Sequence, residues 1–212
     1  MSEHILYGSR GSGSAVAELA LEWAGLPFRI VSAAQWEPGP GFEALKEVNP
    51  LAQIPTLVLP GGAVLTESVA ILIHLGLTQP QSGLLPTEPT TRAIALRALV
   101  FIAANCYSAV SVSDYPERWC TEPDEATCAR VRGAARAQLH RAWEMFGDQF
   151  NAAPFLLGGE PCAADLLAAV VSKWSGTRAH LKAARPVFLA TLMRIEAHPR
   201  VAPVLARHWP AP

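Results

Sequence analysis

Apolar residues in the first part of the chain follow strand spacing, then helix spacing, then strand spacing again. Residues 3–8 (EHILYG) form a short apolar run typical of a buried strand. Residues 15–24 carry the i, i+3, i+4, i+7 pattern of an amphipathic helix at Val16, Leu19, Ala20 and Trp23. Gly25 is a predicted C-cap, and residues 26–33 (LPFRIVSA) indicate a second strand. The chain therefore opens as a β-α-β unit, whose two strands we expect to be parallel.

A Gly-Gly pair marks the turn of a predicted hairpin in the next part of the chain. Residues 37–50 (EPGPGFEALKEVNP) indicate a loop and a short helix before it. Residues 56–60 (TLVLP) and 63–67 (AVLTE) then predict two antiparallel strands. A helix follows over residues 68–78. The order βαβ-α-ββ-α is that of the thioredoxin fold, which is an α+β arrangement.

The second part of the chain carries an almost purely helical pattern. Residues 79–89 are rich in Pro, Thr and Gln, and we interpret them as a linker. Helices are predicted beyond the linker over residues 92–112, 124–150, 163–175, 186–197 and 200–208. We therefore predict a thioredoxin-like domain over residues 1–78 and an all-α helical-bundle domain over residues 90–212.

Charge and composition narrow the classes of partner. The chain has 17 Lys and Arg and 18 Asp and Glu, for a net charge of −1. This near-neutral balance predicts no nucleic-acid partner and no binding to an anionic membrane. The first residues lack the basic and apolar regions of a secretory signal, and Arg97 and Asn105 interrupt the longest apolar run. We expect a cytoplasmic protein without a membrane span.

The four cysteines are Cys106, Cys120, Cys128 and Cys162. They form no CxxC pair and no Cys/His cluster with the spacing of metal ligands. We therefore predict reduced thiols and no metal site.

The dipeptide Ile54-Pro55, just before a predicted strand, allows two interpretations. Proline is tolerated at the start of a strand because the ladder there lacks only one donor. Alternatively, a cis peptide bond would turn the backbone N–H and C=O of Ile54 outward. An extended peptide ligand could then pair with them as an added strand.

The sequence Thr66-Glu67-Ser68, where the hairpin ends and a helix begins, also allows two interpretations. Thr66 or Ser68 could cap the helix, with Glu67 beside its positive end. Alternatively, the free N–H groups and the hydroxyl of Ser68 could bind a ligand carboxylate. Glu67 could then pair with a ligand ammonium, which suits an amino-acid-like head group.

The loop GSRGSGS, between the first strand and the first helix, is the third candidate feature. It lacks both GxGxxG and the Lys-Ser/Thr ending of a P-loop, which argues against a nucleotide site. Ser12 could instead donate to an anion such as a thiolate at the helix N-terminus and lower its pKa. Ser9, Ser14 and Tyr7 are competitors, and any of these serines could simply cap the helix.

These motifs, in this order, resemble the cytosolic glutathione transferase family over nearly the whole chain. The most specific pieces are NPLAQIPTL (residues 49–57) and LTESVAIL (residues 65–72). LYGSRGSGSAVAELALEWAGLPF (residues 6–28) resembles the opening of bacterial, serine-type members. FLLGGEPCAADLLAA (residues 155–169) resembles the family's capping-box segment, in which Asp165 would be the buried acid that holds the turn.

The resemblance implies roles for individual residues in binding glutathione as co-substrate. Pro55 would be the cis-proline, with the Ile54 backbone pairing with the cysteinyl part and Gln53 near the glycyl end. Glu67 and Ser68 would bind the amine and carboxylate of the γ-glutamyl part.

The resemblance also implies how the thiol is activated. Ser12 would stabilise the glutathione thiolate, and Tyr7 would do so if the tyrosine-type pattern applied instead. The activity implied is conjugation of that thiolate to an electrophilic apolar small molecule. The same site would also suit a peroxidase, isomerase or lyase, and a non-catalytic binding module remains the alternative.

The second substrate would meet residues of the first long helical region. Asn105, Tyr107 and Trp119 are the candidates for its pocket, although aromatic residues at such spacing are often core residues. Trp209, near the chain's end, could fold back over the site. Cys162 stands where the family's capping box begins with Ser or Thr, which makes a weaker cap. A homodimer is also implied.

Overall fold

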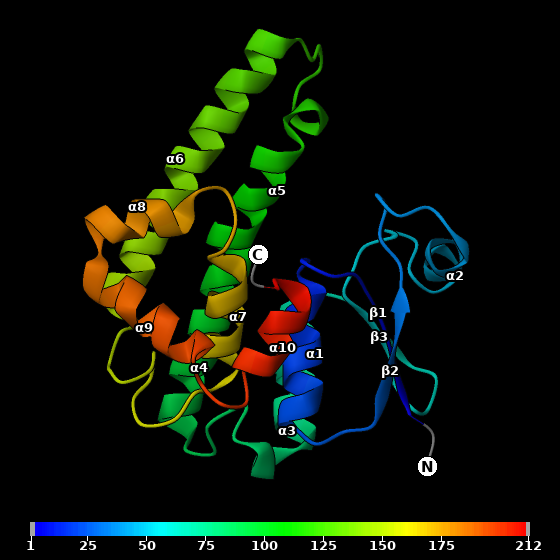
Figure 1. Cartoon of the computed structure of the whole chain (residues 1–212), viewed down its shortest axis with the longest axis vertical. Coiled ribbons are helices and arrows are strands. Elements are labelled where there is room, and N and C mark those ends of the chain that lie inside the picture. The colour runs from blue at the N-terminus through cyan, green and yellow to red at the C-terminus, as the bar shows by residue number, and fades with distance from the viewer. Residues whose placement is uncertain (1–2, 211–212) are drawn as a thin grey trace. The chain divides into compact units, whose positions relative to one another are not determined.

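The computed structural model describes residues 3–210. Cα packing divides the chain into two compact units, Met1–Arg92 with Glu196–Pro212, and Ala93–Ile195. The elements of both units are labelled in Figure 1. Packing thus assigns the last helix to the first unit, and the predicted limits of 1–78 and 90–212 stay a prediction about chain organisation.

The first unit is built on a four-stranded sheet. Its strands are β1 (His4–Gly8), β2 (Phe28–Ser32), β3 (Thr56–Val58) and β4 (Val64–Leu65), in the order β2-β1-β3-β4. β1 pairs with β2 in parallel and with β3 antiparallel, and β3 pairs with β4 antiparallel. The predicted parallel β-α-β opening, the hairpin and the thioredoxin-like order are confirmed, although both hairpin strands are shorter than expected.

Helices cover both faces of this sheet (Figure 1). α1 (Ser14–Trp23) packs against β1 and α3 (Ser68–Thr78), and α2 (Pro40–Val48) packs against β2. The alternation of side chains along β1 explains this division. Tyr7 joins a core cluster with Leu45 of α2, whereas the adjacent Leu6 is turned to the other face and buried there.

The last helix, α10 (Ala202–His208), packs against α1 within the first unit. Glu18 of α1 is buried, and it accepts hydrogen bonds from Arg207 Nε at 2.9 Å and His208 Nε2 at 2.8 Å. Burial acts to raise the pKa of Glu18, but the hydrogen bonds from His208 and Arg207 outweigh it and hold the pKa below its usual value. These charges therefore tie the end of the chain to the first helix.

The second unit is helical, as predicted. Its elements are α4 (Pro89–Phe101), the π-helical turn η2 (Ile102–Tyr107), α5 (Ser108–Asp114), the 3-10 turn η3 (Pro116–Trp119), α6 (Glu125–Gln149), α7 (Ala163–Val171), α8 (Thr177–Ala184) and α9 (Pro186–Glu196). A further 3-10 turn, η1 (Pro80–Ser82), lies in the first unit. Aromatic side chains fill the core of the second unit, and Trp143, Phe146, Phe150 and Phe188 are fully buried.

Helix boundaries differ from the predictions at three places. The first long helix begins at Pro89 because Glu88 accepts the N–H groups of Thr90 and Thr91, and these bonds lower the pKa of Glu88 to about 2. The π turn Ile102–Tyr107 interrupts the predicted helix 92–112, and its residues keep the apolar pattern of that helix. α7 ends at Val171, before the predicted limit of 175, and Ser175 and Gly176 then adopt left-handed conformations just before α8, a helix the sequence analysis missed.

One helical stretch among the described residues, Pro89–Asp114, has the length and composition of a membrane span, with 26 residues and a mean hydropathy of 1.7. Core helices of soluble proteins meet the same criterion. Within the second unit this stretch packs against α6 and α7. Only 39% of its apolar window is buried, so packing accounts for part of its apolar character, and the expectation of no membrane span stays a prediction.

Asp165 holds the turn that starts α7, as expected from the resemblance. Its carboxylate is buried and accepts the backbone N–H groups of Leu156 and Cys162, both at 2.9 Å. Burial raises the pKa of Asp165, and these hydrogen bonds offset part of that rise. The thiol of Cys162 completes the capping box, so the cap is present despite the weaker acceptor.

Replacing Asp165 with Ala should lower the free energy of unfolding by about 2–5 kcal/mol, because two buried N–H groups lose their acceptor. Urea denaturation followed by circular dichroism measures this change. Glu160→Ala, an exposed acid on the same turn, is the matched control and should change stability by less than about 0.5 kcal/mol. Equal stability of the two variants would contradict the role given to Asp165.

Glu18 should make the free energy of unfolding fall as the pH becomes acidic. Its folded pKa is lowered, so its contribution is present above the ordinary value of 4.5 and is lost as the pH falls below that value. Glu18→Gln should therefore cost roughly 1–3 kcal/mol at neutral pH and flatten the pH dependence of stability between about pH 3 and pH 6. Urea denaturation at several pH values across this range measures the free energy of unfolding of Glu18→Gln. The comparison variant is Glu22→Gln, whose side chain is more exposed and which should lose less stability.

Candidate functional site

The sheet topology brings the three predicted site segments of the first unit to one edge. β1 and β4 both run antiparallel to β3. The serine loop that follows β1 and the start of α3, which follows β4, therefore lie at the same edge as the segment that precedes β3. The candidate glutathione-binding residues and Ser12 thus surround one end of the sheet.

Hydrogen bonds fix the segment that precedes β3. The buried side-chain amide of Asn49 donates to Gln53 O at 3.1 Å and to Thr56 Oγ1 at 2.9 Å, and its Oδ1 accepts the N–H of Leu51 at 3.0 Å. Within this frame the Ile54–Pro55 peptide bond is cis, as one of the two interpretations expected. Sequence reasoning noticed Asn49 only as part of a motif and missed its structural role.

Side-chain exposure differs along this segment. Gln53 is exposed, Ile54 is half-buried and Pro55 is buried. The segment therefore leaves Gln53 and part of Ile54 accessible to a ligand.

The start of α3 has an unusual backbone. Glu67 is its N-cap residue, with φ 62° and ψ 114°, a left-handed region that residues other than glycine seldom adopt. Among residues 3–210, no side chain caps this helix end, so the interpretation of Thr66 or Ser68 as a side-chain cap is wrong. Glu67 is exposed and Ser68 is buried. Strain of this kind is most often found where a binding site requires it.

The strand register places these two segments beside each other. Leu57 pairs with Leu65 across the hairpin. Pro55 precedes Leu57 by two residues and Glu67 follows Leu65 by two residues, so both lie beyond the same end of this pair of strands. The cis dipeptide and the first turn of α3 are therefore at the same end of two neighbouring strands.

The serine loop is held by its own hydroxyl groups. Ser12 Oγ donates to Ser9 O at 2.7 Å and lies 2.8 Å from Ser14 Oγ. Ser14 Oγ lies 3.1 Å from Ser9 O and accepts the N–H of Ser9 at 3.1 Å. All three serines are buried. Ser12 stands one residue before the N-cap of α1, Gly13, so its hydroxyl is close to the positive end of that helix.

Tyr7, the alternative thiol-activating residue, has a different environment. It is buried in the core cluster with Ala33 and Leu45. The choice between Ser12 and Tyr7 stays a prediction, and the location of Ser12 at a helix N-terminus favours the serine.

Glu37 is a site residue that the sequence analysis missed. Its carboxylate accepts the hydroxyl of Ser9 at 3.0 Å and the hydroxyl of Ser32 at 3.0 Å. The loop after β2 therefore joins the serine loop at the same sheet edge. No sequence signal marks this contact, because Ser9 and Glu37 lie in separate loops.

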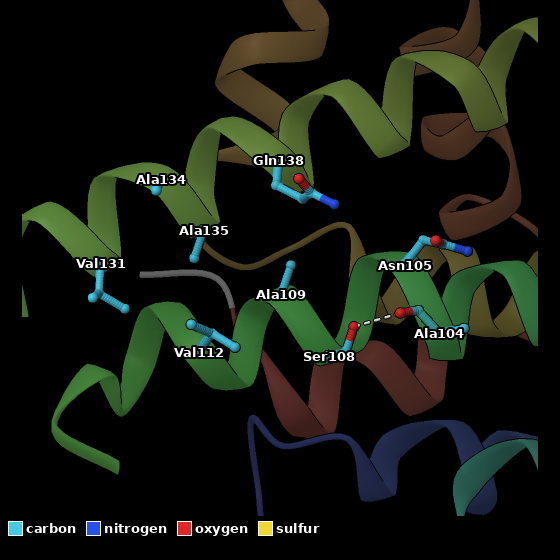
Figure 2. Close-up of a pocket in the computed structure, with 9 residues that line it drawn as sticks. All are labelled: Ala104, Asn105, Ser108, Ala109, Val112, Val131, Ala134, Ala135 and Gln138. Atoms are coloured by element: carbon cyan, nitrogen blue, oxygen red, sulfur yellow. Dashed lines mark hydrogen bonds between the residues drawn. The ribbon is translucent and has the colours of Figure 1, made fainter. Parts of the chain in front are cut away.

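The second unit contains an open groove of about 410 Å³ between α6 and the helix formed by η2 and α5 (Figure 2). It is lined by Ala104, Asn105, Ser108, Ala109, Val112, Val131, Ala134, Ala135 and Gln138. Figure 2 shows Ala109 and Ala135 turned toward each other across it. Ser108 Oγ donates to Ala104 O at 2.5 Å, so this hydroxyl is already engaged in its own helix.

The three candidate pocket residues are not in one place. Asn105 lines the groove, whereas Tyr107 stacks on Trp174 with ring centroids 5.8 Å apart. Trp119 lies in η3 and is exposed. Their roles in a second-substrate pocket stay a prediction.

All four cysteines are free thiols, and Cys106 and Cys162 are buried. Cys106 is fully buried, and burial raises the pKa of its thiol, as expected for an inert core thiol. In the part of the chain that the structure describes, no three His, Cys, Asp or Glu side chains are grouped to hold a metal ion.

Comparison with known proteins bears on this site. The family model described as "Glutathione S-transferase, N-terminal domain" matches residues 14–77. The uncharacterised GST-like protein YncG of Escherichia coli K12 is 31% identical over 170 residues, which are 80% of this chain and 80% of that protein. A probable maleylacetoacetate isomerase of Caenorhabditis elegans is 48% identical over 61 residues, 29% of this chain and 28% of that protein.

Solved structures share the fold over nearly the whole chain. A sphingomonad glutathione S-transferase, solved in complex with glutathione, superposes with a TM-score of 0.78 at 25% identity. The superposition covers 98% of this chain and 100% of that one. The matched N-terminal domain, the extent of the match to YncG and the shared fold show that this chain belongs to the glutathione S-transferase family.

Proposed function

We propose that this protein binds reduced glutathione at the edge of its sheet and conjugates it, through its thiolate, to an electrophilic apolar small molecule. In this reaction the thiolate forms a bond from sulfur to carbon, and either a leaving group departs with the displaced electron pair or a double bond is saturated and the resulting carbanion takes up a proton from water. The protein contributes by lowering the thiol pKa and positioning the reactants.

One observation carries this proposal. Glu67 is exposed in a left-handed conformation at an N-terminus of α3 that no described side chain caps, at the same sheet edge as the cis Ile54–Pro55 dipeptide. An amino-acid head group matches this arrangement, because its ammonium can pair with Glu67 while its carboxylate meets the helix N–H groups and Ser68. The backbone of Ile54 would pair with the cysteinyl part, and Gln53 would approach the glycyl end.

Ser12 is the proposed donor to the thiolate. A hydroxyl that donates to the charged sulfur stabilises the ionised form and so lowers the pKa of the thiol. The N-terminus of α1 acts in the same direction. Tyr7 is the competing donor; both residues are buried, and the place of Ser12 beside the N-terminus of α1 is what favours the serine.

A glutathione-dependent isomerase is the second candidate, since the matching segment of the Caenorhabditis elegans protein belongs to a probable maleylacetoacetate isomerase. Such an enzyme would use the same glutathione site and regenerate glutathione after each turnover. A transferase instead consumes one glutathione molecule for each product. The expected homodimer and the cytoplasmic location stay predictions, and both are compatible with either activity.

Glu67→Gln should weaken glutathione binding about 10- to 100-fold, because a charge-assisted contact to the ligand ammonium is replaced by a neutral one. Isothermal titration calorimetry measures the affinity. Glu43→Gln, an exposed acid on α2 paired with Lys46, is the matched control and should bind as the wild type does. The assignment is wrong if Glu67→Gln binds with wild-type affinity.

Ser12→Ala should raise the pH midpoint of ionisation of the bound glutathione thiol by about 1–2 units, the equivalent of one lost hydrogen bond to a charged group. The ultraviolet absorbance of the thiolate, titrated with pH, reports this midpoint. Tyr7→Phe is the comparison variant and should leave it near the wild-type value, whereas Ser14→Ala, which removes a hydrogen-bond partner of Ser12, should raise it by less than Ser12→Ala does. A shift in Tyr7→Phe alone would assign the thiolate to the tyrosine, and a shift in Ser14→Ala alone would assign it to Ser14.

A further inference from the structure

The imidazole of His208 connects the end of the chain to the serine loop. The side chain is buried at the last position of α10. The N–H of Gly11 donates to His208 Nδ1 at 3.2 Å, and His208 Nε2 lies 2.8 Å from Glu18 Oε2. Since Nδ1 accepts in this geometry, the ring proton is on Nε2 and is donated to the carboxylate.

Glu18 fixes the position of that ring. Its second oxygen, Oε1, accepts two hydrogen bonds from Arg207, at 2.9 Å and 2.6 Å. Arg207 also pairs with Glu22 one turn further along α1. The carboxylate is therefore held on both oxygens, and the imidazole it orients has little freedom to turn.

Gly11 lies in the middle of the serine loop, with Ser9 and Ser12 on either side. It adopts a left-handed conformation, with φ +69°, so the chain turns at this residue. A Cβ on Gly11 would lie 3.7 Å from His208 O and 3.8 Å from Trp209 Nε1, which shows how closely the end of α10 approaches. Trp209 thus lies beside the loop, as the sequence analysis considered.

The loop therefore has an inner network and two outer contacts. The inner network joins the hydroxyls of Ser12 and Ser14 to the backbone of Ser9. The outer contacts are Ser9 Oγ to Glu37 and the Gly11 N–H to His208. The inner network sets the hydroxyls relative to one another, and the outer contacts join the loop to the segment after β2 and to α10.

We propose that His208 is a positioning residue for the serine loop: through the Gly11 N–H it holds the Ser12 hydroxyl at the place where a thiolate is stabilised. The relay from Glu18 through His208 to Gly11 stands on the structure alone. Its consequence for the thiolate rests on the proposed function. His208 itself is not a catalytic residue, because it acts on the loop backbone and not on the reacting atoms.

Replacing His208 with Asn or with Gln removes one of its two hydrogen bonds and keeps the other. The amide of His208→Asn reaches the Nδ1 position and can still accept the Gly11 N–H, but it is too short to reach Glu18. The amide of His208→Gln reaches the Nε2 position and can still donate to Glu18, but it no longer accepts from Gly11. The two variants differ by one methylene, and thermal unfolding checks that both are folded. Arg207→Met, which removes a partner of Glu18 without touching Gly11, is the stability control.

The first readout is hydrogen exchange of the Gly11 amide, measured by nuclear magnetic resonance on the full-length protein. His208→Gln should speed this exchange at least about tenfold, Arg207→Met should keep it near the wild-type rate, and His208→Asn, which keeps the acceptor but loses the Glu18 contact that orients it, should lie between the two. A wild-type rate in His208→Gln overturns the relay. This readout needs no ligand.

The second readout is the pH midpoint of ionisation of the bound glutathione thiol. His208→Gln should raise it by about 0.5–1 unit, and His208→Asn should raise it by less. An unchanged midpoint, in a His208→Gln variant whose Gly11 amide exchanges fast, overturns the positioning role. A wild-type protein that does not ionise bound glutathione refutes the proposed function instead, and the exchange data still decide the relay.

Discussion

The antiparallel pairing of β3 with both of its neighbours is the constraint on which the first unit's site depends. It makes the end of β1, the beginning of β3 and the end of β4 meet at one edge of the sheet. In the proposed binding mode the head group uses the helix N-terminus and Glu67, while the next residue of the ligand pairs with the backbone of Ile54, so both segments have to lie at one end of the sheet. The pairing of β3 with β4 brings both segments to that end.

The parts of this arrangement that depend on neighbouring residues could be predicted from the sequence. Helix α1 could be predicted from the spacing of its apolar residues, and the hairpin could be predicted from two strand-like apolar runs around a Gly-Gly pair. The buried acid Asp165 stands three residues after its cap, so its role can be derived from the local pattern and the family resemblance. In each case the interacting residues are a few positions apart, and the pattern contains both partners.

The parts that depend on distant residues could not be predicted. The Gly11 N–H and His208 are 197 positions apart, and from the sequence His208 resembles any basic residue in the last turn of a helix. The contact of Ser9 with Glu37 joins two loops whose sequences show no complementary pattern. The π turn Ile102–Tyr107 was missed for another reason, because it keeps the apolar composition of the helix it interrupts.

The internal bonding of the serine loop is compatible with donation to a thiolate. Ser12 Oγ donates to Ser9 O in this structure, so its O–H group has to rotate away from that carbonyl before it can donate to a ligand. A charged sulfur is the stronger acceptor, since charge-assisted hydrogen bonds are roughly twice as strong as neutral ones. Ser14 Oγ lies 3.1 Å from the same carbonyl and can keep it satisfied when Ser12 turns. The exchange therefore leaves no buried carbonyl without a donor, and it requires rotation of a hydroxyl but no movement of a loop that Glu37 and His208 hold from outside.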